Sequence, residues 1–153
     1  MVEAPRGMHS ARLDDRGRLK LPVDFQHYVA AFRDKKLFVT SLDRKVGKIY
    51  PLDVWRLNEQ FMAAYHDDPV AARNVAFTAA ELGGESEMDS QGRILLPAEL
   101  RSALGIEQQQ VRLFSNKGHI ELLSEPIYLE RKSDASQNPR EDLNKLEAAG
   151  LPS

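Results

Sequence analysis

Cysteine is absent from this sequence of 153 residues. Its absence excludes a disulfide framework, a thiol nucleophile and a cysteine-ligated zinc site, so nothing in the chain requires an oxidising compartment. No apolar run approaches the roughly 18 residues that a membrane-spanning helix needs, and residues 1–10 lack the apolar core of a signal peptide. We therefore expect a cytoplasmic protein with no membrane partner.

A large excess of charge of one sign is also absent, because 21 Lys and Arg residues nearly balance 23 Asp and Glu residues. The chain thus lacks the overall positive charge that commonly accompanies nucleic-acid binding, and any basic patch has to be local. Residues 1–76 carry 13 basic and 10 acidic groups, whereas residues 77–153 carry 8 and 13. The N-terminal half is therefore the more favourable one for an anionic partner.

The residue patterns of an enzyme are missing as well. The sequence has no nucleophile beside a base, no paired carboxylates with distinctive spacing and no phosphate-binding glycine loop. Its four histidines are scattered, without the spacing that is typical of a metal site: His9, His27, His66 and His119. We expect no enzymatic activity, no metal and no cofactor.

What the sequence does contain is an internal duplication. Residues 14–25 (DDRGRLKLPVDF) match residues 89–100 (DSQGRILLPAEL) at five identical positions, where residue frequencies of about 5–10% predict about one. Residues 46–50 weakly match residues 117–121. We therefore divide the chain into four parts: a first repeat (residues 6–52), a helical insert (53–83), a second repeat (84–128), and a polar linker with a C-terminal helix (129–153).

Each repeat is expected to form a strand, a turn, a short strand, a helix and a hairpin. Strands at residues 8–13 and 85–88 enter the two turns. Pro22 and Pro97 suit the first position of the following helices, and Gly105 is expected to end the second helix. The fold class that follows is α+β, with two duplicated β-α-β half-units and a sheet built from both.

The helical insert is expected to contain a helix capped by Asp53 and a second helix that begins at Asp68 and ends at Gly83. The first helix has two apolar stripes, formed by Val54, Leu57, Phe61 and Ala64 and by Trp55, Met62 and Tyr65. We expect the insert to cover the protein's own core, and a contact with a neighbouring subunit is the alternative. The polar run at residues 130–139 is interpreted as a linker to the C-terminal helix at 140–149.

The duplicated Asp-x-x-Gly-Arg sequence is suited to presenting a cation. In the first loop (residues 14–18) and the second loop (residues 89–93), the Asp side chain can accept hydrogen bonds from the backbone, and the Gly permits a positive φ. The planar fork of an Arg matches guanine O6 and N7 in the major groove and also binds phosphate. We therefore expect Arg18 and Arg93 to contact double-stranded DNA.

The charges around the two loops differ. Further cations lie near the first loop in the sequence, namely Arg12, Arg16 and Lys20, and they are expected to make it the more positive loop. Acidic residues precede the second loop: Glu81, Glu85 and Glu87.

A competing interpretation is that each Arg pairs with the Asp of its own loop only to stabilise the turn. Because a turn needs Asp and Gly but has no need of Arg in both copies, we favour DNA contact. The alternative function is a structural or protein-interaction module that assembles into a homo-oligomer without specific DNA binding.

Residues 14–22 and 89–97 resemble the paired signature sequences of the MraZ family. Three further segments resemble other parts of that family: Arg6-Gly7, residues 48–55 (KIYPLDVW) and residues 138–151. The resemblance covers residues 6–151 and implies a swapped-hairpin barrel of the AbrB type, assembled into ring-like homo-oligomers. It implies a nucleoid-associated transcriptional regulator that binds short G-rich direct repeats upstream of the division and cell wall gene cluster, which includes its own gene. It also implies DNA contact by Arg18 and Arg93, in loops shaped by Asp14, Gly17, Asp89 and Gly92.

Overall fold

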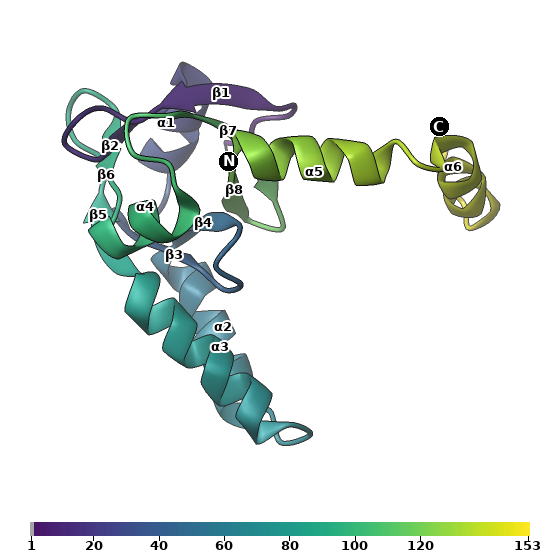
Figure 1. Ribbon diagram of the computed structural model, residues 1–153, viewed down its shortest axis with the longest axis horizontal. Helices are drawn as coiled ribbons and strands as arrows, with labels where there is room; N and C mark the ends of the chain where they lie inside the picture. The colour runs from purple at the N-terminus through teal and green to yellow at the C-terminus, as the bar shows by residue number, and fades with distance from the viewer. Residues whose placement is uncertain (1) are drawn as a thin grey trace.

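The computed structural model describes residues 2–153, which form an antiparallel α+β fold (Figure 1). The first repeat contains β1 (His9–Arg12), β2 (Arg18–Lys20), α1 (Val23–Ala30), β3 (Lys36–Ser41) and β4 (Gly47–Pro51). The second repeat contains β5 (Gly84–Glu87), β6 (Arg93–Leu95), α4 (Ala98–Leu104), β7 (Gln110–Asn116) and β8 (His119–Ser124). The predicted α+β class and the predicted order of elements within each repeat are confirmed.

The strands of the two repeats are interleaved. A six-stranded sheet has the order β1-β7-β8-β4-β3-β5, so the first strand of each repeat pairs with the third strand of the other. The short strands β2 and β6 pair with each other in a separate two-stranded sheet. Within residues 2–153, β1 and β5 remain the two ends of the larger sheet, and a barrel closes only when every strand has two partners. The closed barrel that the family resemblance implies is therefore not formed by this chain.

Two pairs of equivalent residues face each other in these ladders. Leu19 of β2 lies opposite Ile94 of β6, its counterpart 75 residues later. Ile49 of β4 lies opposite Ile120 of β8, and these two residues are also counterparts in the weaker part of the sequence match. A residue faces its own counterpart in an antiparallel pair where a two-fold axis passes between them. The two repeats are therefore related by a local two-fold axis through both pairs.

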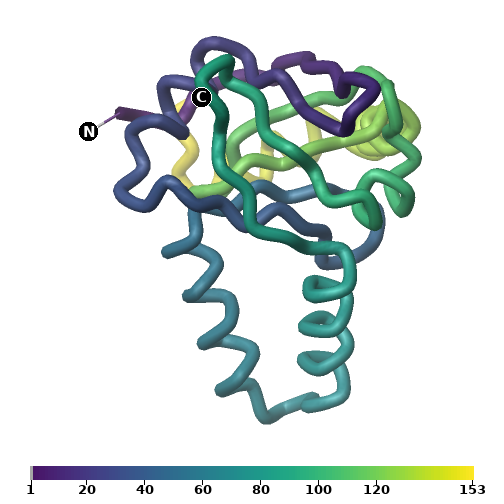
Figure 2. Tube along the Cα trace, turned by 90° about the vertical axis from the view of Figure 1, so that its left-hand side faces the viewer, coloured from purple at the N-terminus to yellow at the C-terminus, as the bar shows by residue number. Residues whose placement is uncertain are grey.

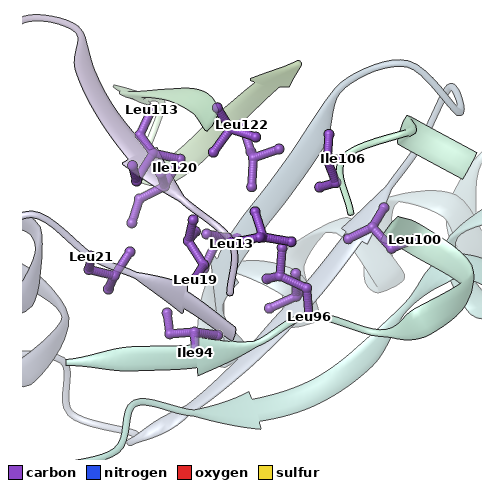
Figure 3. Packing of buried hydrophobic residues seen from close by; sticks show 14 of the residues in the cluster. Leu13, Leu19, Leu21, Ile94, Leu96, Leu100, Ile106, Leu113, Ile120 and Leu122 are labelled. Atoms are coloured by element: carbon purple, nitrogen blue, oxygen red, sulfur yellow. The ribbon is translucent and has the colours of Figure 1, made fainter. Parts of the chain in front are cut away.

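The main hydrophobic core draws on both repeats (Figure 3). Its fully buried side chains include residues of the short strands and of the segments that follow them: Leu19, Leu21, Phe25, Ile94, Leu96 and Leu100. Full burial of one Leu or Phe side chain contributes about 1.5–3 kcal/mol. Because each repeat supplies only part of this core, the position of each loop depends on the folding of both.

The starts and ends of the helices follow the predictions with small shifts. Pro22 and Pro97 stand one residue before α1 and α4, in the N-cap position rather than in the first helical position. Asp53 does not cap its helix, because the helix begins after Pro51 and Asp53 lies in its first turn. Gly105 ends α4 with a φ of +65°, as predicted.

The helical insert is a hairpin of α2 (Leu52–Ala64) and α3 (Pro69–Leu82) that projects from the sheets (Figures 1 and 2). Asp68 caps α3 as predicted, since its carboxylate accepts a hydrogen bond from a backbone N–H of the first turn at 3.0 Å.

One side of this hairpin packs on the body and the other does not. Trp55 is buried, and its ring stacks on that of Phe38 in β3 with the ring centroids 4.6 Å apart. Leu57 and Phe61 are 63% and 66% exposed. The hairpin therefore covers part of the protein's own core, as predicted, and leaves an apolar stripe uncovered in the single chain.

The segment after β8 differs from the prediction. The polar run that was interpreted as a linker is largely helical, because α5 spans Glu125–Ala135 and α6 spans Pro139–Ala148. Ser124 starts α5, since its hydroxyl oxygen accepts a hydrogen bond from the N–H of Ile127 at 3.4 Å. The linker prediction was wrong because polarity does not exclude a helix that packs on little. No residue of α5 or α6 is buried, and the two helices extend from the body as an arm (Figure 1).

Candidate nucleic-acid interface

A single carboxylate organises the first loop. Oδ1 of Asp14 accepts hydrogen bonds from the backbone N–H groups of Arg16 and Arg18, both at 2.9 Å. Oδ2 of Asp14 accepts a third hydrogen bond, from Nε of Arg18 at 2.8 Å. Gly17 donates its N–H to the carbonyl oxygen of Asp14 at 3.2 Å and has a φ of +79°. The loop therefore has one defined shape, in which the side chain of Arg18 is also held.

The second loop has the same geometry. Oδ1 of Asp89 accepts hydrogen bonds from the N–H groups of Gln91 and Arg93, both at 2.9 Å, and Oδ2 accepts one from Nε of Arg93 at 2.8 Å. Gly92 donates its N–H to the carbonyl oxygen of Asp89 at 3.0 Å and has a φ of +77°. Asp89 and Gly92 thus occupy the same places in their turn as Asp14 and Gly17 do in theirs.

Both arginines form the ion pair that the competing interpretation describes. The side chains of Arg18 and Arg93 are 29% and 25% exposed, and each pairs with its Asp through Nε. Within residues 2–153, the terminal amino groups of these two side chains form no hydrogen bond. Because a guanidinium has five N–H donors, the ion pair fixes its direction and leaves the terminal donors for another acceptor. The ion pair and a contact with DNA are therefore compatible.

Hydrogen bonding keeps the two carboxylates ionised. The backbone N–H of Arg18 makes the largest contribution, lowering the pKa of Asp14 below its ordinary value of 3.8, and a smaller effect of burial opposes it. The backbone N–H of Arg93 lowers the pKa of Asp89 in the same way. Both loops therefore keep their acceptors at neutral pH.

The two loops lie on the same side of the molecule. Arg18 begins β2 and Arg93 begins β6, and these strands are paired about the local two-fold axis. Both loops are at the left-hand side of Figure 1, away from the arm of α5 and α6, and Figure 2 views the molecule from that side. The structure thus brings together Arg18 and Arg93, which are far apart in the sequence.

The structure places one flanking cation differently from the prediction. Lys20 lies opposite Arg93 in the β2–β6 ladder, and its Nζ donates to the carbonyl oxygen of Gln91. Contrary to the expectation, Lys20 adds its charge beside the second loop and not the first, because antiparallel pairing brings the end of β2 next to the end of the second loop. Arg16 is exposed in the first loop, and Arg12 is exposed on β1.

Two of the acidic residues that precede the second loop have basic partners from the first repeat. Arg44 pairs with Glu81 through Nη1 at 2.6 Å, and Lys36 pairs with Glu85 through Nζ at 3.7 Å. Such exposed pairs contribute little to stability, yet each one offsets a negative charge locally. The second loop is therefore less surrounded by negative charge than the sequence suggests.

Two side chains that the sequence did not single out contact the loops. Gln26 of α1 lies against Gly92, and Arg101 of α4 lies against Gly17. The two residues are 75 positions apart, as the loops are, so the duplication itself contained a signal that could have identified them.

Two further properties of residues 2–153 concern other kinds of site. No group of three or more His, Asp or Glu side chains in this range is close enough together to hold a metal ion. No helix in the same range is both long and apolar enough to cross a membrane.

Known proteins resemble the chain over both repeats. A family model described as "MraZ protein, putative antitoxin-like" matches residues 83–145. The transcriptional regulator MraZ of Acidobacterium capsulatum is 34% identical over 148 residues, which cover 95% of this chain and 99% of that protein. The transcriptional regulator MraZ of Koribacter versatilis is 35% identical over 103 residues, covering 67% of this chain and 70% of the relative.

A third relative has a similar degree of identity. The transcriptional regulator MraZ of Thermomicrobium roseum is 36% identical over 108 residues, or 69% of this chain and 71% of that protein. These relatives are named as regulators and not as enzymes, and the expectation that the chain is not an enzyme is confirmed. Identity of this degree over almost the whole length of two proteins shows common descent, and the chain therefore belongs to the MraZ family.

Proposed function

We propose that this protein is a transcriptional regulator that binds double-stranded DNA sequence-specifically through its two loops. Its family supports the regulatory role, because the relatives are named as transcriptional regulators. Arg18 and Arg93 are the proposed contacts with bases or phosphates, and Arg12, Arg16 and Lys20 are the proposed phosphate contacts beside them.

The observation that supports this proposal most strongly is the duplicated, ion-paired arginine. Asp14 holds Arg18, and Asp89 holds Arg93, with the same atoms and distances. The backbone bonds to Asp and the conformation of Gly already close each turn, so the contact with Nε is not needed for the turn itself. Because the guanidinium is already oriented, less side-chain conformational entropy is lost when it forms a bidentate contact with DNA.

Base contacts and phosphate contacts contribute to different properties of such a complex. A bidentate Arg contact with guanine discriminates against other bases by about 1–3 kcal/mol. Phosphate contacts release counterions and make the affinity depend on salt. Short G-rich direct repeats, which the family resemblance implies, offer the acceptors that Arg18 and Arg93 would bind. The proposed target is the division and cell wall gene cluster, including the protein's own gene.

The proposal extends to an AbrB-type swapped-hairpin arrangement and to ring-like homo-oligomers. The exchange of first strands between the repeats supports the former. A ring would place several pairs of loops along one rim, so that many weak contacts act together despite the net charge of -2. Nucleoid association would follow from binding to DNA.

A second candidate function is a structural module that assembles without specific DNA binding. The uncovered apolar stripe at Leu57 and Phe61 favours it, as does the fact that Arg18 already has an ion-pair partner. Salt distinguishes the two candidates. DNA binding through several phosphates weakens log-linearly with salt, whereas an assembly held by apolar contacts is nearly insensitive to it.

The test is fluorescence anisotropy with the DNA upstream of the protein's own gene, over a salt series, beside a scrambled duplex. We expect Arg18→Ala and Arg93→Ala each to lower specific affinity by about tenfold or more, as the loss of one good base contact would. Arg73→Ala, which removes an exposed cation from α3 in the helical hairpin, is the charge-matched control and should change little.

Light scattering on the same samples reports the oligomeric state. Wild-type binding no tighter to the target than to scrambled DNA would contradict the proposal. Loss of the oligomer in Arg18→Ala with DNA binding retained would support the structural module instead.

A further inference from the structure

The helix of each repeat contacts the loop of the other repeat. Gln26 on α1 and Arg101 on α4 occupy equivalent positions 75 residues apart. Gln26 belongs to the first repeat and lies against Gly92 of the second loop, whereas Arg101 belongs to the second repeat and lies against Gly17 of the first loop. A Cβ atom on Gly92 would overlap the amide of Gln26, and one on Gly17 would overlap the guanidinium of Arg101. The contact is therefore reciprocal about the local two-fold axis.

Hydrogen bonds connect Arg101 to the first loop and to a second anchor. Nε of Arg101 donates to the carbonyl oxygen of Leu96 at 3.1 Å, and the N–H of Leu96 donates to the carbonyl oxygen of Gly17 at 3.0 Å. Nη1 of Arg101 also bonds both carboxylate oxygens of Glu107, at 3.0 and 2.9 Å. The side chain of Arg101 is 15% exposed. It is therefore held from two directions against the glycine of the first loop.

Gln26 connects to the second loop by the equivalent path. Its Nε2 donates to the carbonyl oxygen of Leu21 at 2.7 Å, and the N–H of Leu21 donates to the carbonyl oxygen of Gly92 at 3.0 Å. Among residues 2–153, the amide of Gln26 forms no further hydrogen bond of the kind that ties Arg101 to Glu107. The two loops thus have the same support, with one additional anchor for the first.

We propose that Arg101 and Gln26 are positioning residues of the DNA-binding loops, Arg101 for the first loop and Gln26 for the second. This inference rests on the proposed function, because it assumes that the loops bind DNA. Each loop can approach the helix of the other repeat only because it has a glycine at that point. A displacement of either helix is thereby transmitted to the loop that contacts it. The additional anchor at Glu107 makes the first loop the more rigid of the two.

The contact can be tested first in the free, full-length protein by amide hydrogen exchange. We expect Arg101→Ala to accelerate exchange of the backbone N–H groups of the first loop by about tenfold, by favouring local opening, and to leave those of the second loop unchanged. Gln26→Ala should have the reverse effect. Arg101→Gln, which introduces the residue that the first repeat uses, keeps a donor for Leu96 and should change exchange much less than Arg101→Ala does.

The consequence for DNA binding is tested by combining these variants with the loss of one loop. We expect Arg101→Ala to weaken specific DNA binding by about fivefold to tenfold when it is introduced into the wild type or into Arg93→Ala. In Arg18→Ala the same substitution should have little further effect, because the contributions of coupled residues are not additive. Gln26→Ala should show the opposite dependence. Arg101→Gln should restore most of the affinity that Arg101→Ala loses.

The outcomes separate this inference from the proposed function. Equal acceleration of exchange in both loops, or an equal loss of affinity in the Arg18→Ala and Arg93→Ala backgrounds, is the mark of a general effect on stability and would overturn the inference. Loop-specific changes in exchange in a protein that does not bind the target DNA would support the positioning contact and refute the proposed function.

Discussion

Lys20 of β2 lies opposite Arg93 of β6, so a cation of the first repeat lies beside the second loop. The counterpart of Lys20 is Leu95, which lies opposite Arg18 and is 55% exposed. The two loops therefore share their internal geometry but differ in their neighbours. We therefore expect the two loops to contribute differently to DNA binding, because a cation neighbours the second loop and an apolar side chain neighbours the first.

Exchanging these two neighbours tests whether they contact DNA. If Lys20 neutralises one phosphate, Lys20→Ala should reduce the slope of log affinity against log salt by about 0.9. Leu95→Lys adds the missing cation beside Arg18 and should increase the slope by a similar amount. Anisotropy over a salt series measures both. An unchanged slope in both variants would place this ladder outside the DNA interface.

Replacing Asp14 separates the orientation of Arg18 from the charge of the loop. Asp14→Asn keeps an oxygen for the backbone N–H groups but removes the ion pair with Nε. The variant is more positive by one unit, so electrostatic attraction alone predicts tighter DNA binding. We expect weaker binding, by about tenfold, because the charge-assisted bond that orients the guanidinium is lost.

The adjacent carboxylate provides a matched control for that experiment. Asp15→Asn changes the net charge equally, and within residues 2–153 the side chain of Asp15 forms no ion pair. We expect Asp15→Asn to leave DNA affinity unchanged or slightly higher. Equal effects of the two substitutions would indicate that charge, and not orientation, is what matters.

Glu121 is expected to make the stability of the fold depend on pH. Burial raises the pKa of Glu121, but hydrogen bonds from His119 at 2.8 Å and Lys48 at 2.9 Å outweigh it and lower the pKa from 4.5 to about 2. Because the pKa is lower in the folded state, the stabilisation is complete above pH 4.5 and is lost as the pH falls towards 2.

The corresponding variant is Glu121→Gln, studied by urea unfolding at several pH values. At pH 7 we expect the free energy of unfolding to fall by about 3 kcal/mol, the equivalent of the shift in pKa. Near pH 2 the difference from the wild type should almost vanish. Glu130→Gln on the exposed arm is the control and should have little effect at any pH. A loss from Glu121→Gln that is the same at every pH would contradict this account.

Gly17 and Gly105 both have a positive φ, but only Gly17 has a side chain against it. Its φ is +79° and Arg101 occupies the space of a Cβ, whereas Gly105 has a φ of +65° and no atom within 4 Å of that position. We expect backbone strain of about 1–2 kcal/mol from either Gly17→Ala or Gly105→Ala. Gly17→Ala should in addition displace Arg101 and weaken DNA binding, which Gly105→Ala should not. Thermal unfolding and anisotropy measure the two effects, and equal DNA affinities of the two variants would contradict the prediction.

The amino-acid sequence alone was enough to predict the features that depend on contacts within a few residues. The cap of α3 by Asp68 and the end of α4 at Gly105 were predicted correctly, because a cap depends on its own turn of the chain. The duplication predicted one order of elements for both repeats, and the structure has that order. The helix α5 was missed because its polar sequence has no apolar stripe from which a helix can be identified.

Which residues surround each loop depends on the packing of the two repeats against each other. Lys20 is two residues from the first loop in sequence, yet it contacts the second, because β2 and β6 pair antiparallel. Gln26 and Arg101 each contact the loop of the other repeat, because the first strands are exchanged and the local two-fold axis brings each helix to the opposite loop. Such contacts join residues that are far apart in the chain. Burial of the core that both repeats share determines which residues meet, and no local pattern of residues specifies this.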